Sequence, residues 1–269
     1  PLNVKIIRDV IRVQSVRWRA EETVGYVRIT TFNEKTMPGL ERAMKALHEE
    51  LGEDMTGVVL DLRNNPGGLL EQAVSVSDAF LDRGEVVSTR GRNARDAQRF
   101  NASRGDLAKG LPVIVLINAN SASASEIVAG ALQDHRRGLI LGESSFGKGT
   151  VQTIIQVGPD AAMRLTTARY YTPSGRSIQE LGIEPDIEVA QMRVSEDGKQ
   201  RKPRRERDLK GHFANEEGPV DPESQETAPV TEEAISAAAP QGEVRDYQLD
   251  YALNLMRSIA LYQQRVVMN

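Results

Sequence analysis

Residues 118–128, NANSASASEIV, hold three serines that alternate with alanines ahead of a glutamate and an apolar run. A serine hydroxyl becomes a nucleophile when a neighbouring base takes its proton. An apolar strand-like segment precedes these serines and a helical pattern follows them, which is the arrangement of a nucleophile elbow. N–H groups at the start of such a helix would lie close to the hydroxyl. The alternative is that one serine caps the helix and the others are merely small.

A serine nucleophile needs a base, and histidine is the usual one. The sequence contains three histidines: His48 in an amphipathic helical segment, His135 at the end of another, and His212 in a polar stretch. None of them follows a strand, whereas the serines do. We therefore do not expect a Ser-His-Asp triad.

Lys148 is the candidate base that the local sequence favours. It lies between two glycines in GESSFGKGTVQTII, after one predicted strand and before another. Glycine lets the backbone approach other elements closely, and a lysine withdrawn from water has a lowered pKa and can accept a proton from serine. A phosphate-binding loop is the alternative, but glycine follows Lys148 where that motif requires serine or threonine.

Strands and helices alternate along the middle of the chain, which predicts an α/β core with right-handed crossovers. The expected strands are 24–32, 57–63, 111–118 and 137–143, the expected helices are 38–51, 69–81 and 125–135, and 150–172 reads as a hairpin. Ligands collect at the carboxyl ends of parallel strands. Two unusual loops occur there: NNPGG at 64–68 and the serine run itself.

The composition excludes several classes of protein and site. The 269 residues include no cysteine, so disulfides, thiol catalysis and cysteine-bound zinc are excluded. A net charge of −4 gives no general attraction to nucleic acid. No stretch approaches the length of a membrane span. The chain begins at Pro1 without a signal peptide, and we expect it to be a fragment or a processed form.

The two ends differ from the core. Residues 2–13 are rich in β-branched side chains and read as one or two strands. Residues 191–243 are charged and nearly free of aromatics, which is typical of a flexible segment. Residues 244–269 regain helical spacing, and their apolar side chains could dock on the core or join two chains. These apolar positions are Tyr247, Leu249, Leu253, Leu255, Met256, Ile259 and Leu261.

Three long motifs together resemble one family closely. GVVLDLRNNPGGLLEQAV, NANSASASEIVAGALQDHRRGLILGESSFGKGTVQT and LTTARYYTPSGRSIQELGIEPDI are similar to the core of the carboxy-terminal processing (tail-specific) proteases, S41-type serine endopeptidases. The resemblance covers residues 1–186. It implies that Ser123 is the nucleophile, that Lys148 is the general base, and that Gln152 orients the lysine.

The resemblance also assigns supporting groups. It implies an oxyanion hole made by the N–H of Ala124 and an N–H of the glycine turn, either Gly67 or Gly68. Glu126 and Asp134 match positions that we interpret as supporting the site. Ser121 and Ser125 would then have no chemical role, with Ser125 as the helix N-cap.

The resemblance implies an α/β fold like the layered crotonase and Clp protease core, with no cofactor and no metal. Residues 1–23 would be a remnant of a preceding PDZ domain with connecting strands, 24–190 the protease core, 191–243 the flexible segment and 244–269 a helical extension. A PDZ module binds substrate C-termini by strand addition.

The implied partners are proteins or peptides with accessible C-termini. The resemblance also allows an adaptor protein and a homo-oligomer formed through the C-terminal helix, and it implies a bacterial periplasm or cell envelope. The rival hypothesis is a non-catalytic peptide-binding or scaffold protein that keeps the cleft.

Overall fold

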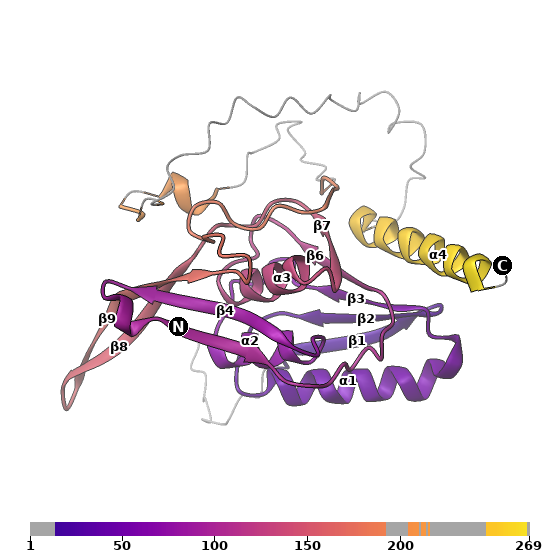
Figure 1. Ribbon diagram of the computed structural model, residues 1–269, viewed down its shortest axis with the longest axis horizontal. Coiled ribbons are helices and arrows are strands. Elements are labelled where there is room, and N and C mark those ends of the chain that lie inside the picture. Colours follow the sequence, from indigo (N-terminus) through magenta and orange to yellow (C-terminus); the bar gives the residue numbers. More distant parts are fainter. Residues whose placement is uncertain (1–13, 192–203, 210, 214, 216–245, 268–269) are drawn as a thin grey trace, which may run out of the picture.

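The computed structural model describes residues 14–191, 204–209, 211–213, 215 and 246–267 (Figure 1). Its helices are α1 (Thr36–Leu51), α2 (Leu70–Asp78), α3 (Ala124–Asp134) and α4 (Tyr247–Val267), with short 3-10 turns η1 (Gly52–Asp54), η2 (Ala94–Asp96) and η3 (Glu206–Asp208). The expected helices are all present, and the ends of the three in the core agree to within three residues. The expected strands at 2–13 and most of the segment 191–243 lie outside the described residues.

A six-stranded sheet forms the centre of the fold. Its order is β1-β2-β3-β6-β7-β10, with β1 antiparallel to β2 and the remaining neighbours parallel. The strands are β1 (Val16–Glu21), β2 (Val24–Ile29), β3 (Gly57–Asp61), β6 (Val113–Ile117), β7 (Gly138–Gly142) and β10 (Ile187–Glu188). Every residue of β3 and β6 is buried, as the continuous apolar runs predict.

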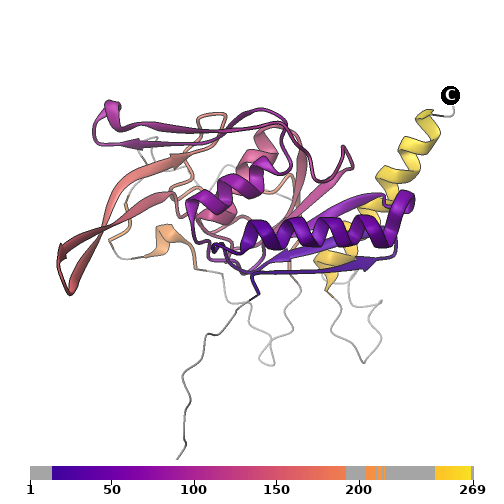
Figure 2. The ribbon, with the colours of Figure 1, turned by 90° about the horizontal axis from the view of Figure 1, so that it is seen from below.

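Helices cover both faces of this sheet (Figures 1 and 2). Alternate strand residues point to opposite faces, so Leu60 and Val115 pack in the core that also holds side chains of α1, α2 and α3. Val59 and Leu116 point the other way and pack with Ala252 and Met256 of α4. The C-terminal helix therefore docks on its own core, which was one of the two roles predicted for it.

A second, four-stranded antiparallel sheet has the order β5-β4-β9-β8. It consists of β4 (Gly84–Gly91), β5 (Gln98–Ala102), β8 (Thr150–Gly158) and β9 (Ala161–Tyr171). The β8–β9 hairpin was predicted, and it extends away from the body of the molecule (Figures 1 and 2). β4, β5 and β10, and with them the division into two sheets, were not predicted from the sequence.

Candidate active site

The serine run and the glycine turn are hydrogen-bonded neighbours. They follow β6 and β3, which are adjacent parallel strands, so both lie at one edge of the sheet. Ser121 Oγ donates to the carbonyl oxygen of Leu62 at 2.9 Å. The carbonyl oxygen of Asn65 accepts from the Ala122 N–H at 3.0 Å and from Ser125 Oγ at 2.9 Å. The outer two serines thus fasten one loop to the other.

Ser123, the middle serine, occupies the strained position of the turn. Its backbone has φ 56° and ψ −111°, outside the regions that L-residues prefer. It is the N-cap residue of α3, and its side chain is half-buried. The assignment of Ser125 as N-cap was wrong, because α3 begins at Ala124 and Ser125 lies in its first turn. Strain at one residue in a turn of this kind is typical of functional sites.

Position 67 requires glycine because its backbone lies too close to the serine turn for a side chain to fit. A Cβ there would lie 2.7 Å from the carbonyl oxygen of Ala122 and 2.9 Å from both Ala124 N and Ser123 Cβ. Its φ of 99° also favours glycine. The NPGG turn therefore brings its backbone directly against Ser123.

The two glycines of the turn differ in what their N–H groups do. The Gly67 N–H donates to Asn65 Oδ1 at 2.9 Å. Within the described part of the chain, the N–H groups of Gly68 and Ala124 have no protein acceptor. Gly68 is also exposed, whereas Gly67 is buried. Of the two glycines, Gly68 is the one with a donor to offer to a ligand.

Glu126 joins the serine turn to the lysine loop. Its Oε2 accepts the backbone N–H of Ser123 at 2.7 Å and that of Lys148 at 3.0 Å. The two backbones are therefore held against one carboxylate oxygen, although they are 25 residues apart in sequence. The Lys148 side chain is half-buried. Gly149 after it packs tightly, since a Cβ there would lie 2.2 Å from Gln179 N.

The carboxylate of Glu126 is buried and is hydrogen-bonded at its second oxygen as well. Its Oε1 accepts from Ser145 Oγ at 2.5 Å and from the Gly147 N–H at 2.7 Å, and the residue is fully buried. Burial raises the pKa of Glu126 to about 7, although the four hydrogen bonds to its carboxylate act in the opposite direction.

Among the described contacts, none joins Gln152 or Asp134 to Ser123 or Lys148. Gln152 is exposed on β8, beside an irregularity in the pairing with β9. Asp134 lies at the far end of α3, about 15 Å along the helix from Ala124. Its Oδ2 accepts the Ser174 N–H at 2.8 Å, and Arg176 lies 3.7 Å from Oδ1. Asp134 thus contacts the loop after β9 and is not brought to the site.

The histidines are engaged elsewhere. Nε2 of His48 and of His135 lies 2.8 and 2.7 Å from a backbone carbonyl oxygen, and His212 forms an ion pair with Glu180. None of the three has a hydrogen bond with Ser123 among the described contacts. Among the residues that the structure describes, no three His, Asp or Glu side chains lie together in a way that could hold a metal ion.

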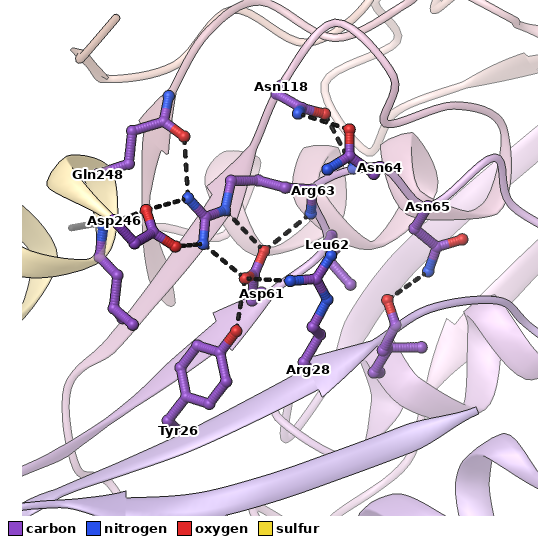
Figure 3. A network of polar contacts seen from close by, with 12 residues as sticks. Tyr26, Arg28, Asp61, Leu62, Arg63, Asn64, Asn65, Asn118, Asp246 and Gln248 are labelled. Atoms are coloured by element: carbon purple, nitrogen blue, oxygen red, sulfur yellow. Dashed lines mark hydrogen bonds and ion pairs between the residues drawn. The ribbon is translucent and has the colours of Figure 1, made fainter. Parts of the chain in front are cut away.

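A charged cluster beside the glycine turn was not selected from the sequence. Figure 3 shows Arg63 between Asp61 and Asp246, with Tyr26 donating to Asp61 at 2.7 Å. Burial, followed by the charge of Asp61, raises the pKa of Tyr26 to about 12. The available signal was the pair of opposite charges that interrupts the apolar run as DLR at 61–63. Such residues are rarely buried unless they are paired.

The family model for "Peptidase family S41" matches residues 23–189. The chain belongs to peptidase family S41. The carboxy-terminal-processing protease of Bartonella bacilliformis is 60% identical over 192 residues, which are 71% of this chain and 44% of that protein. The carboxyl-terminal-processing protease of Synechocystis is 40% identical over 177 residues, 66% of this chain and 40% of that protein. The chain thus spans under half the length of these S41 relatives.

Solved structures share the mixed α/β fold of this S41 chain. The photosystem II D1 C-terminal processing protease matches with a TM-score of 0.60 and 33% identity, over 67% of this chain and 49% of that one. A lipoprotein from Streptococcus agalactiae matches with a TM-score of 0.53 at 17% identity and 66% coverage of each chain, which shows the fold alone. No helix among the described residues is both long and apolar enough to cross a membrane.

Proposed function

We propose that this chain is the peptidase core of a serine endopeptidase that cuts proteins near their C-termini through a Ser123–Lys148 dyad. One observation carries the proposal: a single oxygen of buried Glu126 accepts the N–H groups of both residues. The serine turn and the lysine loop are fixed against each other there. The strained backbone of Ser123 is a second support, because strain is retained where surrounding contacts enforce it.

In the proposed mechanism, Ser123 Oγ attacks the carbonyl carbon of the scissile peptide bond. Lys148 Nζ takes the hydroxyl proton and returns it to the leaving amine, so that an acyl-enzyme remains. Water then attacks the ester while Lys148 accepts its proton and passes it to Ser123 Oγ, so that the new C-terminus is released and the free serine is restored. Gln152 is assigned the orientation of the lysine from the family resemblance. Its exposed place on β8, four residues after Lys148, is compatible with that assignment.

The negative charge of the tetrahedral intermediate needs donors close to Ser123. We assign this role to the N–H groups of Ala124 and Gly68. Both are without a protein acceptor in the described structure, whereas the Gly67 N–H is used by Asn65. The start of α3 adds a partial positive charge at the same place. Loss of one such donor costs on the order of 100-fold in rate.

The names of the relatives support the choice of substrate. Proteins named carboxy-terminal-processing proteases are 60% and 40% identical over their matched regions. Proteins or peptides with accessible C-termini are therefore the substrates we propose. A preceding PDZ domain, an adaptor protein and a bacterial periplasmic or envelope location are also proposals, and they rest on the family resemblance.

A non-catalytic peptide-binding protein is the rival, and cleavage of casein separates the two. We expect the wild-type chain to degrade casein, and the Ser123→Ala and Lys148→Met variants to be at least 1,000-fold slower, in line with losses seen for nucleophiles and bases on the order of 10⁴ or more. Ser75→Ala, on the exposed side of α2, is the matched control and should retain full activity. Cleavage by Ser123→Ala at the wild-type rate, or a wild type that binds casein without cutting it, contradicts the proposal.

A second proposed role for α4 is assembly. Its first half docks on the core, but Leu261 and Tyr262 are 61% and 71% exposed. Apolar side chains grouped on a surface often mark a contact with another chain. Light scattering of a truncation before Val244 tests this role. A full-length oligomer whose truncated form keeps the same number of subunits would refute it.

A further inference from the structure

The guanidinium group of Arg63 is fully occupied between two carboxylates. Its Nε and Nη2 donate to the two oxygens of Asp61 at 3.0 and 2.7 Å, and Nη1 and Nη2 donate to those of Asp246 at 2.7 and 2.6 Å (Figure 3). Nη1 also donates to Gln248 Oε1 at 3.0 Å. All five guanidinium N–H groups therefore have an acceptor. The Arg63 side chain is only 4% exposed.

Three of these five hydrogen bonds are accepted by residues at the start of the C-terminal helix. Asp246 also caps α4, because its Oδ1 accepts the Leu249 N–H at 3.2 Å. Gln248 Nε2 donates to the carbonyl oxygen of Val189, beside the end of β10. Partial burial would raise the pKa of Asp246, but the hydrogen bonds and charge of Arg63 outweigh it and hold that pKa below its ordinary value. The helix is thus fastened to Arg63 by an ionised, hydrogen-bonded pair.

Arg63 is also the residue from which the glycine turn begins. The next residue, Asn64, donates its N–H to Asn118 Oδ1 at 2.9 Å, and the carbonyl oxygen of Asn65 accepts from Ala122. Three residues further on is Gly68, whose N–H is assigned to the oxyanion hole. The position of Arg63 is therefore one of the constraints on where that N–H points.

We propose that Arg63 is a positioning residue for the turn 64–68. Full turnover then requires α4 to be docked on the core through the ion pair between Asp246 and Arg63. This rests on the proposed function of Ser123 and Gly68. Without Asp246, two N–H groups of a buried cation lose an acceptor. Arg63 keeps its pair with Asp61, but the two unsatisfied donors of a buried guanidinium are unfavourable, so the arginine moves toward water and the start of the turn moves with it. The segment after β2 still holds the turn, because the Phe32 N–H donates to the carbonyl oxygen of Gly67, so activity falls without being abolished.

The test compares Asp246→Ala with Arg257→Ala on a peptide that the wild type cleaves. Arg257 is the matched control, since it joins the same helix to Glu22 by an exposed ion pair away from the turn. A peptide boronic acid, which forms a tetrahedral adduct with serine, reports on the oxyanion hole. We expect Asp246→Ala to lower kcat by between about 10-fold and 100-fold, the latter being loss of a donor outright. Boronate affinity should fall by a similar factor, KM should change by less than about threefold, and Arg257→Ala should match the wild type.

A second variant keeps the test decisive if Asp246→Ala does not fold. Asp246→Asn keeps a helix cap and one acceptor oxygen for Arg63, and it should show a smaller fall in kcat and in boronate affinity. All assays run at a temperature where thermal melts show every variant folded. Unchanged kcat in a folded Asp246 variant, or equal losses in Asp246→Ala and Arg257→Ala, would overturn the inference while leaving the protease assignment intact. A wild type without Ser123-dependent cleavage would instead overturn the proposed function.

Discussion

Replacing Glu126 with glutamine changes one carboxylate oxygen to an amide nitrogen and leaves the shape of the side chain unchanged. The carboxylate accepts four hydrogen bonds, two at each oxygen, from Ser145, Gly147, Ser123 and Lys148. An amide nitrogen is a donor, so in either orientation it faces two donors across distances of 2.5 to 3.0 Å. Glu126→Gln therefore breaks one of the two pairs of contacts.

The effect of Glu126→Gln on the free energy of unfolding depends on pH. Burial of Glu126 determines whether the wild-type value rises or falls with pH. Burial raises the pKa of Glu126 from 4.5 to about 7, so the folded chain binds more protons than the unfolded chain between these values. The free energy of unfolding should then fall as pH rises through this window, by about 3 kcal/mol in total. The glutamine variant lacks this titration. Its two unpaired donors cost about 1–3 kcal/mol each.

We therefore expect the variant to be less stable than the wild type at pH 5 by about 2–6 kcal/mol, and the difference to shrink by about 3 kcal/mol by pH 8. Urea unfolding at both pH values measures this difference, and exposed Glu53→Gln is the control that should show none. Turnover of a folded Glu126→Ala variant, which removes both oxygens, should drop at least about 100-fold, because Ser123 and Lys148 lose their common anchor. Near-normal turnover, or a stability difference that does not vary with pH, would refute the reasoning.

Three further predictions concern the neighbourhood of the site. Gly67→Ala places a methyl group against the serine turn and should lower casein cleavage more than tenfold, whereas Gly158→Ala, with open space around it, should not; equal activities of these two would contradict the close approach. Met256→Ala empties the contact of α4 with the sheet and should cost about 2–5 kcal/mol in urea unfolding, so a loss below 1 kcal/mol would argue against the docked helix. A folded variant without the three histidines should cleave casein at a rate near that of the wild type, and an inactive one would disprove a lysine base.

Much of the central sheet could be predicted because its strands are buried on both faces. The runs at 57–63 and 111–118 have no alternation to misread, and the helices between them carry clear apolar spacing. β4 and β5 were missed because their sequences mix polar and apolar residues, and the pairing of β4 with β9 is a long-range contact that no local pattern reveals.

The candidate site was predicted in part for similar reasons. Local motifs indicated the serine turn, the lysine loop and the glycine turn, and the structure places the three together. The different roles of the three serines could not be read locally, since they alternate with alanines in one short run and the difference lies in their contacts with the loop after β3. The Arg63–Asp246 pair joins residues 183 positions apart, and no spacing rule connects them.

Because the site is divided between two sheets, it can form only late in the folding of the chain. Ser123 follows a strand of the central sheet, Lys148 leads into the second sheet, and Glu126 holds them together with Ser145. Ser145 is itself held by the Ile183 N–H, so the last contact needed comes 60 residues after the nucleophile. During synthesis a chain long enough to expose the serine still lacks the segment that completes the site. The proposed Ser123–Lys148 site is therefore completed only after the chain has folded as far as Ile183.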